Sequence, residues 1–281
     1  MAMTNASEWT GPVGRSWASE WQRTDRSFTQ LTARLVARIA AVPGRRILDL
    51  GCGAGELSLS IARARPGAGV LGIDISEDLI ATAQIRGEGV ANARFAVADA
   101  STWSELAFRP DLLVSRHGVM FFDDPVVAFR HIAGASEPGA RLLFSCFGPF
   151  AENPWASELA TTIAPAEAAA FTDPHAPGPF AFADPLRVQS ILENAGWTDI
   201  ACVAEHFTYI AGAGHDPVSD ALEFFRRIGP AAPRLRAMPE SDRAEAESAL
   251  RALLKRRLIG NHVCFDAMAW IVSARTPGES T

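Results

Sequence analysis

A glycine-rich loop follows the first strongly apolar run of the chain. The loop reads Asp49-Leu50-Gly51-Cys52-Gly53-Ala54-Gly55 and comes directly after Arg46-Ile47-Leu48. Glycines let a backbone turn sharply and let a ligand lie close against it. A buried strand that runs into such a loop and then into a helix is typical of cofactor sites in open α/β sheets.

Two classes of cofactor compete for a loop of this kind. A dinucleotide fingerprint, G-x-G-x-x-G, requires glycine at position 56, where the chain has Glu56. Carboxylates at Asp49 and Glu56 would repel a pyrophosphate, but they would tolerate a cofactor that carries an ammonium and a sulfonium group. The loop therefore favours S-adenosylmethionine over NAD, and a nucleotide-dependent oxidoreductase is the disfavoured alternative.

Two further carboxylates end the next two apolar runs. Asp74 ends 70–74, where it could accept hydrogen bonds from both ribose hydroxyls, and Asp99 follows 94–98, where it could accept from the adenine amino group. Each aspartate alone would more often cap a helix or lie in a solvated loop. Together with Asp49 and the glycine loop, they indicate one cofactor site.

The run Ile47 to Gly55 resembles motif I of the class I S-adenosylmethionine-dependent methyltransferases. Within that class, the chain is similar to the ubiquinone/menaquinone-methyltransferase-like group, which carries the type 11 methyltransferase domain. The similar stretches extend over nearly the whole chain and include 17–28, 115–125, 137–142, 152–155, 178–180 and 269–272.

The resemblance implies cofactor contacts at the ends of the first four strands. The expected cofactor-binding residues are Asp49, Gly51, Cys52, Gly53, Asp74, Ile75, Asp99, Ala100 and Arg116. Cys52 is expected to contact the cofactor through its backbone, although a thiol at a helix N-terminus could also have a lowered pKa. His117 stands where the family pattern has an aromatic side chain.

Methyl transfer from a sulfonium is an in-line displacement, so the protein mainly aligns the acceptor. A hydroxyl or acidic-carbon acceptor also needs a base, and His117 is the candidate catalytic residue. The simpler interpretation is that His117 lines the pocket and moves no proton. We expect no metal, because Ser115, Arg116 and His117 stand where a magnesium-dependent subclass would need carboxylates.

The elements around these residues alternate between short apolar runs and helical segments. This alternation predicts an α/β fold with a mainly parallel, doubly wound sheet. The resemblance implies a Rossmann-like sheet of seven strands in the order 3-2-1-4-5-7-6, with the last strand antiparallel. We expect a helical N-terminal segment over 1–43 and a methyltransferase domain over 44–281, with a proline-rich cap insertion over 147–183. Trp9, Trp17 and Trp21 would close over the cofactor or acceptor, or else pack on the sheet.

The composition of the chain indicates which classes of binding partner and which cellular location to expect. A net charge of −6 and a pI of about 5.6 disfavour a nucleic-acid partner. Four widely spaced cysteines, no apolar run after a basic start in 1–21 and no bilayer-length apolar stretch predict a cytoplasmic protein without membrane attachment. We expect a small-molecule acceptor, methylated on O, C or N, and a homodimer as the commonest assembly. A fold relative that binds the cofactor without transferring methyl stays an alternative.

Overall fold

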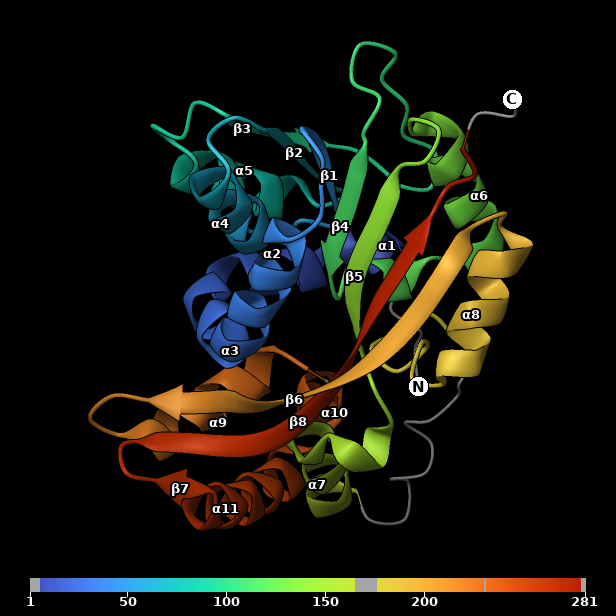
Figure 1. Ribbon diagram of the computed structural model, residues 1–281. Helices are drawn as coiled ribbons and strands as arrows, with labels where there is room; N and C mark the ends of the chain where they lie inside the picture. The colour runs from blue at the N-terminus through green and yellow to red at the C-terminus, as the bar shows by residue number, and fades with distance from the viewer. Residues whose placement is uncertain (1–5, 165–175, 230, 279–281) are drawn as a thin grey trace.

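The computed structural model describes residues 6–164, 176–229 and 231–278. Its centre is one sheet with the strand order β3-β2-β1-β4-β5-β8-β6, with β7 paired to β8 at one end (Figure 1). The strands are β1 Arg46–Leu50, β2 Gly69–Asp74, β3 Ala93–Val97, β4 Leu112–Arg116, β5 Arg141–Phe147, β6 Thr198–Ala213, β7 Leu258–Ile259 and β8 His262–Arg275.

The sheet has the predicted topology. Strands β1 to β5 pair in parallel, and β8 pairs antiparallel with both β5 and β6. Without the two-residue β7, the order is the expected 3-2-1-4-5-7-6, so the fold-class prediction is confirmed. The additional strand arises because the chain folds back on itself just before β8, where Ile259 pairs with His262.

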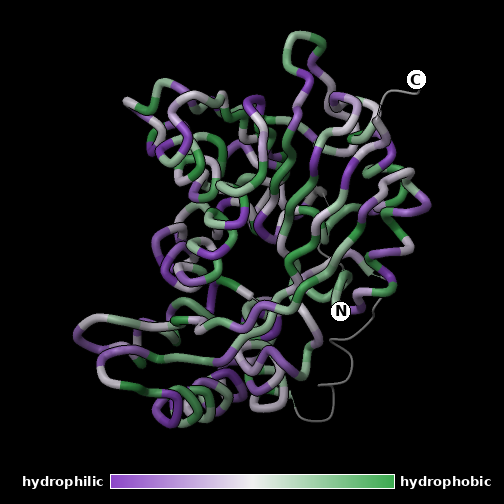
Figure 2. Tube along the Cα trace, viewed as in Figure 1, coloured by the Kyte–Doolittle hydropathy of each residue, from purple (hydrophilic) through white to green (hydrophobic). Residues whose placement is uncertain are grey.

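Helices cover both faces of the sheet. In Figure 1, α3 and α4 lie on one side and α6 and α8 on the other. Hydrophobic residues concentrate along the central strands, and the helices show polar residues outward (Figure 2). The helices are α1 Ala6–Trp9, α2 Pro12–Ser19, α3 Trp21–Ala40, α4 Glu56–Ala64, α5 Glu77–Arg86, α6 Pro125–Ala135, α7 Pro154–Ile163, α8 Pro185–Asn194, α9 Pro217–Arg227, α10 Ala231–Ala237 and α11 Glu240–Arg256.

The N-terminal segment is helical, as expected, but it forms three helices. The chain breaks at Gly11 and again at Glu20, which has a non-helical backbone. Helix α2 packs on the start of α5 so closely that a Cβ at Gly14 would lie 2.4 Å from the Ser76 hydroxyl. Ser76 is the N-cap of α5, and its hydroxyl accepts a hydrogen bond from the Leu79 amide. The N-terminal helices are therefore tied to the strand end that carries Asp74.

A second lobe extends from the sheet. Strands β6 and β8 continue beyond it as a long two-stranded ribbon, and α7, α9, α10 and α11 pack around this ribbon (Figure 1). We call this assembly the cap lobe. The sequence interpretation placed the cap only in 147–183. Of that segment, α7 belongs to the lobe, 176–183 packs back on the sheet, and 165–175 lies outside the described residues.

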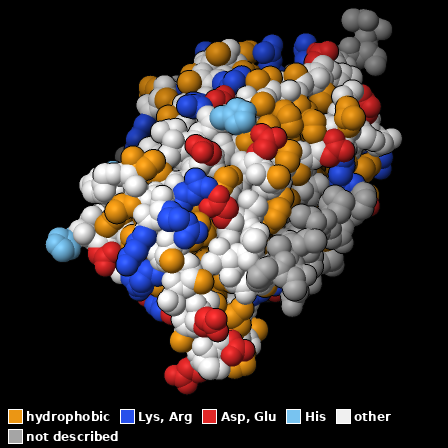
Figure 3. Space-filling view, turned by 90° about the horizontal axis from the view of Figure 1, so that it is seen from below, with side chains coloured by type: hydrophobic (Ala, Val, Ile, Leu, Met, Phe, Trp, Pro, Cys, Tyr) orange, Lys and Arg blue, Asp and Glu red, His pale blue; other side chains and the backbone are white. Residues whose placement is uncertain are grey.

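The underside of the cap lobe carries charges of both signs (Figure 3). Helix α11 contributes acidic side chains in its first turn and basic ones, Lys255 and Arg256, in its last turn. This distribution complements the helix dipole. Across the described ranges, no helix combines the length and the apolar composition that crossing a bilayer requires.

Candidate functional site

One cavity of about 510 Å³ opens at the carboxyl ends of the parallel strands. It extends from the glycine loop to the cap lobe, and α1, α2 and α3 line it from the other side. All ten residues that the sequence singled out line this cavity: Asp49, Gly51, Cys52, Gly53, Asp74, Ile75, Asp99, Ala100, Arg116 and His117. The structure therefore brings together residues from four strand ends.

The glycine loop turns with left-handed backbone conformations. Gly51, Gly53 and Gly55 have φ values of +64°, +55° and +84°. A Cβ at Gly51 would lie 2.9 Å from the Cα of Gly118, in the loop after β4, whereas a Cβ at Gly53 would meet no atom within 4 Å. Gly51 thus allows two loops to approach, and Gly53 leaves an open cradle for a ligand.

Asp49 lies buried at the end of β1. Its Oδ2 accepts a hydrogen bond of 2.6 Å from the Ser58 hydroxyl, and its Oδ1 has no hydrogen-bond partner in the described part of the chain. Burial raises the pKa of Asp49 to about 7, against the opposing effect of Ser58. A buried acceptor without a donor is costly, so a cationic donor group of a ligand fits this position.

Asp74 and Asp99 occupy the next two strand ends. The Asp74 carboxylate accepts from the backbone amides of Gly53 and Ser76, each at 2.9 Å. Burial raises the pKa of Asp74, and these amides oppose the rise. Asp99 is exposed, and its Oδ1 accepts from the amide and hydroxyl of Ser101. Both side chains have capacity for further donors, because each carboxylate oxygen accepts about two hydrogen bonds.

Arg116 lies largely buried at the end of β4 among acidic side chains. Its guanidinium forms an ion pair with Glu56, lies 3.9 Å from Asp25 and donates to the Thr32 hydroxyl at 2.7 Å. Glu56 is therefore largely neutralised. Two features still disfavour a pyrophosphate at this loop. One is the carboxyl group of Asp49, and the other is the lack of a glycine at position 56.

His117 follows β4 with φ +59°, a conformation that few residues other than glycine adopt. Its ring stacks on Phe147 with centroids 4.0 Å apart and 10° between the planes. Both ring nitrogens are buried, and neither has a partner among the described residues. Burial, and then the charge of Arg116, hold the pKa of His117 well below its usual value. The imidazole is thus neutral at pH 7.

The other sequence interpretations concern Cys52 and three tryptophans. Burial, and then Asp74 and Asp49, raise the pKa of the Cys52 thiol well above its usual value, so Cys52 is not a thiolate. Trp9, Trp17 and Trp21 all line the cavity. Trp9 contacts Trp17 at a centroid distance of 5.6 Å, and Arg86 lies over Trp21. Within the described ranges, no three His, Cys, Asp or Glu side chains gather as metal ligands.

Sequence reasoning missed the half of the cavity that the cap lobe and α3 supply. The missed lining residues include Thr24, Asp25, Phe28, Trp155 and Tyr209. Thr24, Ser27 and Thr32 are buried polar residues on the inward face of α3. Of these three, Thr24 lines the cavity, whereas Ser27 and Thr32 bond to protein groups, so a buried polar residue on an apolar helix face was a weak signal for the cavity.

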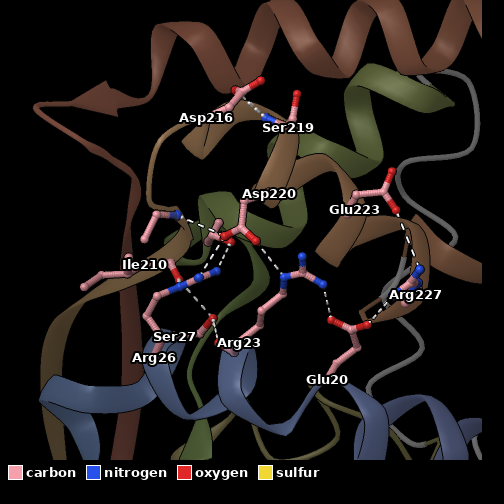
Figure 4. A network of polar contacts seen from close by, with 12 residues as sticks. Glu20, Arg23, Arg26, Ser27, Ile210, Asp216, Ser219, Asp220, Glu223 and Arg227 are labelled. Atoms are coloured by element: carbon pink, nitrogen blue, oxygen red, sulfur yellow. Dashed lines mark hydrogen bonds and ion pairs between the residues drawn. The ribbon is translucent and has the colours of Figure 1, made fainter.

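A charged network joins α3 to the cap lobe beside the cavity (Figure 4). Glu20 is buried and binds Arg23 at 2.6 Å and Arg227 of α9 at 2.5 Å. Asp220 of α9 binds Arg23 at 2.7 Å and Arg26 at 2.8 Å, and it also accepts from the Ala213 amide. Shared partners order several side chains at once, so the network fixes α3 relative to α9.

We expect Asp220→Asn to lower the free energy of unfolding at pH 7 by about 1–3 kcal/mol, because the charge-assisted hydrogen bonds weaken. Burial alone would raise the pKa of Asp220, but Ala213, Arg23 and Arg26 hold it below its usual value. The stabilisation is therefore present above the unfolded-state pKa and is lost as pH falls through the lower folded-state pKa.

Urea unfolding between pH 3 and pH 7 measures this effect. The matched control is Glu105→Gln, which removes an exposed pair with Arg94 and should cost about 0–1 kcal/mol. Equal losses in both variants would show that the network contributes no more than a surface pair.

Comparison with known proteins gives one family match and several relatives. The family described as "Methyltransferase domain" matches residues 21–201. A trans-aconitate 2-methyltransferase of Methylobacterium radiotolerans is 30% identical over 185 residues, which are 66% of each chain. A ubiquinone biosynthesis O-methyltransferase of Hahella chejuensis is 36% identical over 110 residues, covering 38% of this chain and 44% of that protein.

The solved structure of Haemonchus contortus phosphoethanolamine N-methyltransferase 2 with S-adenosyl-L-methionine has the same fold. It superimposes with a TM-score of 0.53 and 18% identity, covering 93% of this chain and 56% of that one. The matches to the first three curated relatives span 66%, 46% and 42% of their lengths.

Proposed function

Since the chain belongs to the methyltransferase-domain family, we propose that it transfers a methyl group from S-adenosylmethionine to a small-molecule acceptor without a metal. We assign this function to the whole protein, although the family match at 21–201 includes only α7 of the cap-lobe helices. The four unpaired cysteines support a cytoplasmic location, and a homodimer is our expectation for its assembly.

One observation carries this proposal. Asp49, Asp74 and Asp99 lie at the carboxyl ends of three neighbouring parallel strands and line one cavity around the glycine loop. The buried, unpartnered Oδ1 of Asp49 fits an ammonium donor, the Asp74 carboxylate fits ribose hydroxyls, and Asp99 fits an adenine amino group. A pyrophosphate would instead place its negative charge beside the Asp49 carboxyl group, whose Oδ1 offers it no donor.

We assign roles to the predicted residues on this basis. Gly51, Cys52 and Gly53 would present backbone to the cofactor, and Ile75 and Ala100 would border its base and ribose. Arg116 would act through its acidic partners, since its guanidinium is already bound to Glu56 and lies near Asp25. His117 is the candidate base, because it faces the cavity with both nitrogens free of partners in the described ranges.

The bound cofactor would supply an activated methyl group. The chain's own residues would hold the acceptor in line with that methyl group and exclude water. Orientation of this kind can supply roughly 7–11 kcal/mol of the barrier. The enclosing helices α1 to α3 and the cap lobe would provide it, because they close the cavity opposite the strand ends.

Calorimetry with S-adenosylmethionine and with NAD tests the proposal. We expect binding of S-adenosylmethionine and none of NAD. The protein should then release S-adenosylhomocysteine when one member of an acceptor panel is added. NAD binding would overturn the proposal in favour of an oxidoreductase. Cofactor binding with no transfer to any acceptor would favour the alternative of a binding or rearrangement protein on the same fold.

A further inference from the structure

Arg86 connects two walls of the cavity from behind. It is the last residue of α5, and its guanidinium donates to the Ala54 carbonyl of the glycine loop at 2.6 Å and to Oδ2 of Asp25 in α3 at 2.5 Å. Ala54 and Asp25 line the cavity, whereas the described residues that line it do not include Arg86. Arg86 therefore contacts both walls without facing the space that a ligand would occupy.

The same guanidinium also lies over an aromatic ring of α3. Its Cζ is 3.9 Å from the centre of the Trp21 ring, and Trp21 lines the cavity. Trp21 and Asp25 are four residues apart, so they lie on one face of α3. An arginine suits this position, because its planar group can stack on a ring and bind two acceptors along its edge. One side chain of α5 thus holds the start of α3.

A second arginine binds Asp25 from the other side. Nη2 of Arg116 lies 3.9 Å from Oδ1 of Asp25, and Arg116 forms an ion pair with Glu56, the first residue of α4. Glu56 stands two residues after Ala54, the residue that Arg86 binds. These contacts therefore form a closed set, which we call the charge ring. It starts on the glycine loop, passes through α3 and returns to the residue directly after the loop.

Burial makes the contacts of the charge ring depend on one another. The side chains of Arg86 and Asp25 are only 16% and 17% exposed. Burial raises the pKa of Asp25, and the charges of Arg116 and Arg86 oppose this rise. Removing one partner of a buried ion pair is strongly destabilising, because the other charge stays buried without compensation. Displacement of α3 would therefore leave both arginines without their shared carboxylate, directly beside the glycine loop.

The conformation of the glycine loop depends on its hydrogen bonds. Ala54 stands between Gly53 and Gly55, which both have left-handed backbones, and glycine adopts many other conformations as readily. The Gly55 amide donates to the Cys52 carbonyl at 3.0 Å, and the Ala54 carbonyl of the same peptide accepts from Arg86. Arg86 therefore fixes the orientation of this peptide, and its own position depends on α3.

On the basis of the proposed methyl-transfer function, we propose that Arg86 is a positioning residue that couples the docking of α3 to the cofactor-binding conformation of the glycine loop. A docked α3 holds Arg86 on the Ala54 carbonyl, and a correctly formed loop holds Arg86 beside Asp25. Linkage then requires that a bound cofactor stabilises the docked α3, and that the docked α3 tightens cofactor binding by the same factor. Arg86 acts through these neighbours and touches no reacting atom.

Two measurements on the full chain test this coupling. Calorimetry with S-adenosylhomocysteine gives the affinity, and hydrogen exchange of the α3 amides, with and without saturating S-adenosylhomocysteine, gives the protection that the ligand confers on α3. Arg86→Met keeps an unbranched stem but removes every donor, so it should weaken binding about 10-fold and reduce the protection by a similar factor. Arg86→Lys keeps a cation between Ala54 and Asp25, so it should restore part of both.

Arg65→Met is the matched control. Arg65 donates to the carbonyls of Ile39, near the end of α3, and Gly44, at 3.3 and 2.8 Å. Its loss should speed α3 exchange equally with and without S-adenosylhomocysteine and leave the affinity unchanged.

The outcomes separate this inference from the proposed function. If the unmodified chain binds S-adenosylhomocysteine and Arg86→Met behaves like Arg65→Met, the coupling is overturned and the proposed function stands. An Arg86→Lys protein that regains thermal stability but neither affinity nor protection would also overturn the coupling. An unmodified chain that binds neither S-adenosylmethionine nor S-adenosylhomocysteine would overturn the proposed function and this inference with it.

Discussion

Replacing Gly51 by alanine is expected to lower the free energy of unfolding by about 2–5 kcal/mol. A left-handed backbone costs a residue with a Cβ about 1–2 kcal/mol, and overpacking typically costs about 1–3 kcal/mol more. The overpacking arises because the new Cβ would lie 2.9 Å from the Cα of Gly118, which is backbone and cannot rotate away. Since native domains are stabilised by only about 5–15 kcal/mol, much of the protein could unfold at 37 °C.

Two other glycines provide matched controls for Gly51→Ala. Gly53→Ala has the same backbone strain but no atom within 4 Å of the new Cβ. It should lose only about 1–2 kcal/mol of stability but should lose detectable binding of S-adenosylmethionine, since the methyl group enters the cradle. Gly134→Ala lies within α6 in open space and should gain about 0.5–1 kcal/mol.

Urea unfolding and calorimetry separate these outcomes. The interpretation of the loop fails if Gly51→Ala is as stable as Gly134→Ala. It fails equally if Gly53→Ala binds S-adenosylmethionine with the affinity of the unmodified protein.

Asp49→Asn is expected to weaken S-adenosylmethionine binding about 10- to 100-fold at pH 8. A hydrogen bond to a charged group contributes about 1.5–3 kcal/mol, and about 1.4 kcal/mol corresponds to a tenfold change. The buried Oδ1 would otherwise meet the ammonium group of the ligand. The matched control is Asp111→Asn, at the opposite end of β1, where the carboxylate accepts from the Arg45 and Arg46 amides. It should lower stability without changing affinity.

The pH dependence provides a second readout for Asp49. Burial raises its pKa to about 7, so the folded protein binds more protons than the unfolded chain between about pH 4 and pH 7. Its contribution to the free energy of unfolding therefore falls as pH rises through this window and is level above it. Affinity for the cofactor should move oppositely, tightening from pH 6 to pH 8 as Asp49 ionises.

Asp49→Asn should remove both of these pH dependences, and it should be at least as stable as the unmodified protein at pH 8. Calorimetry at pH 6, 7 and 8 is the decisive measurement. An affinity that changes with pH in the same way in the variant would show that another group binds the ammonium.

The strand ends were predictable because their residues obey local rules. Asp49, Asp74 and Asp99 each follow an apolar run, and the carboxyl ends of parallel strands meet at one edge of a sheet. Ser76 caps α5 as its position before two acidic residues predicts. These features depend on neighbours within a few residues and on a strand order that the family resemblance supplies.

The half of the cavity that the cap lobe and α3 supply could not be predicted in this way, because its contacts join segments that are distant in the sequence. Trp155 stacks on Tyr209, and Arg116 binds Glu56 and lies near Asp25 of α3. No periodicity in the sequence links these positions. The prolines of 147–183 predict a cap insertion there, which includes α7, whereas the other helices of the cap lobe lie at 217–256. The long β6–β8 ribbon that supports the lobe reads only as two ordinary strands.

The β6–β8 ribbon also places the cap-lobe residues of the cavity on different elements from the aspartates at the strand ends. The three aspartates that would hold the methyl donor lie at the carboxyl ends of β1, β2 and β3, whereas the cavity-lining Trp155 and Tyr209 belong to α7 and the ribbon. Evolution could therefore redraw the acceptor specificity by exchanging cap-lobe helices while inheriting the donor site intact. For protein engineers, the same separation marks the lobe as the part to recombine between relatives when a new acceptor is wanted.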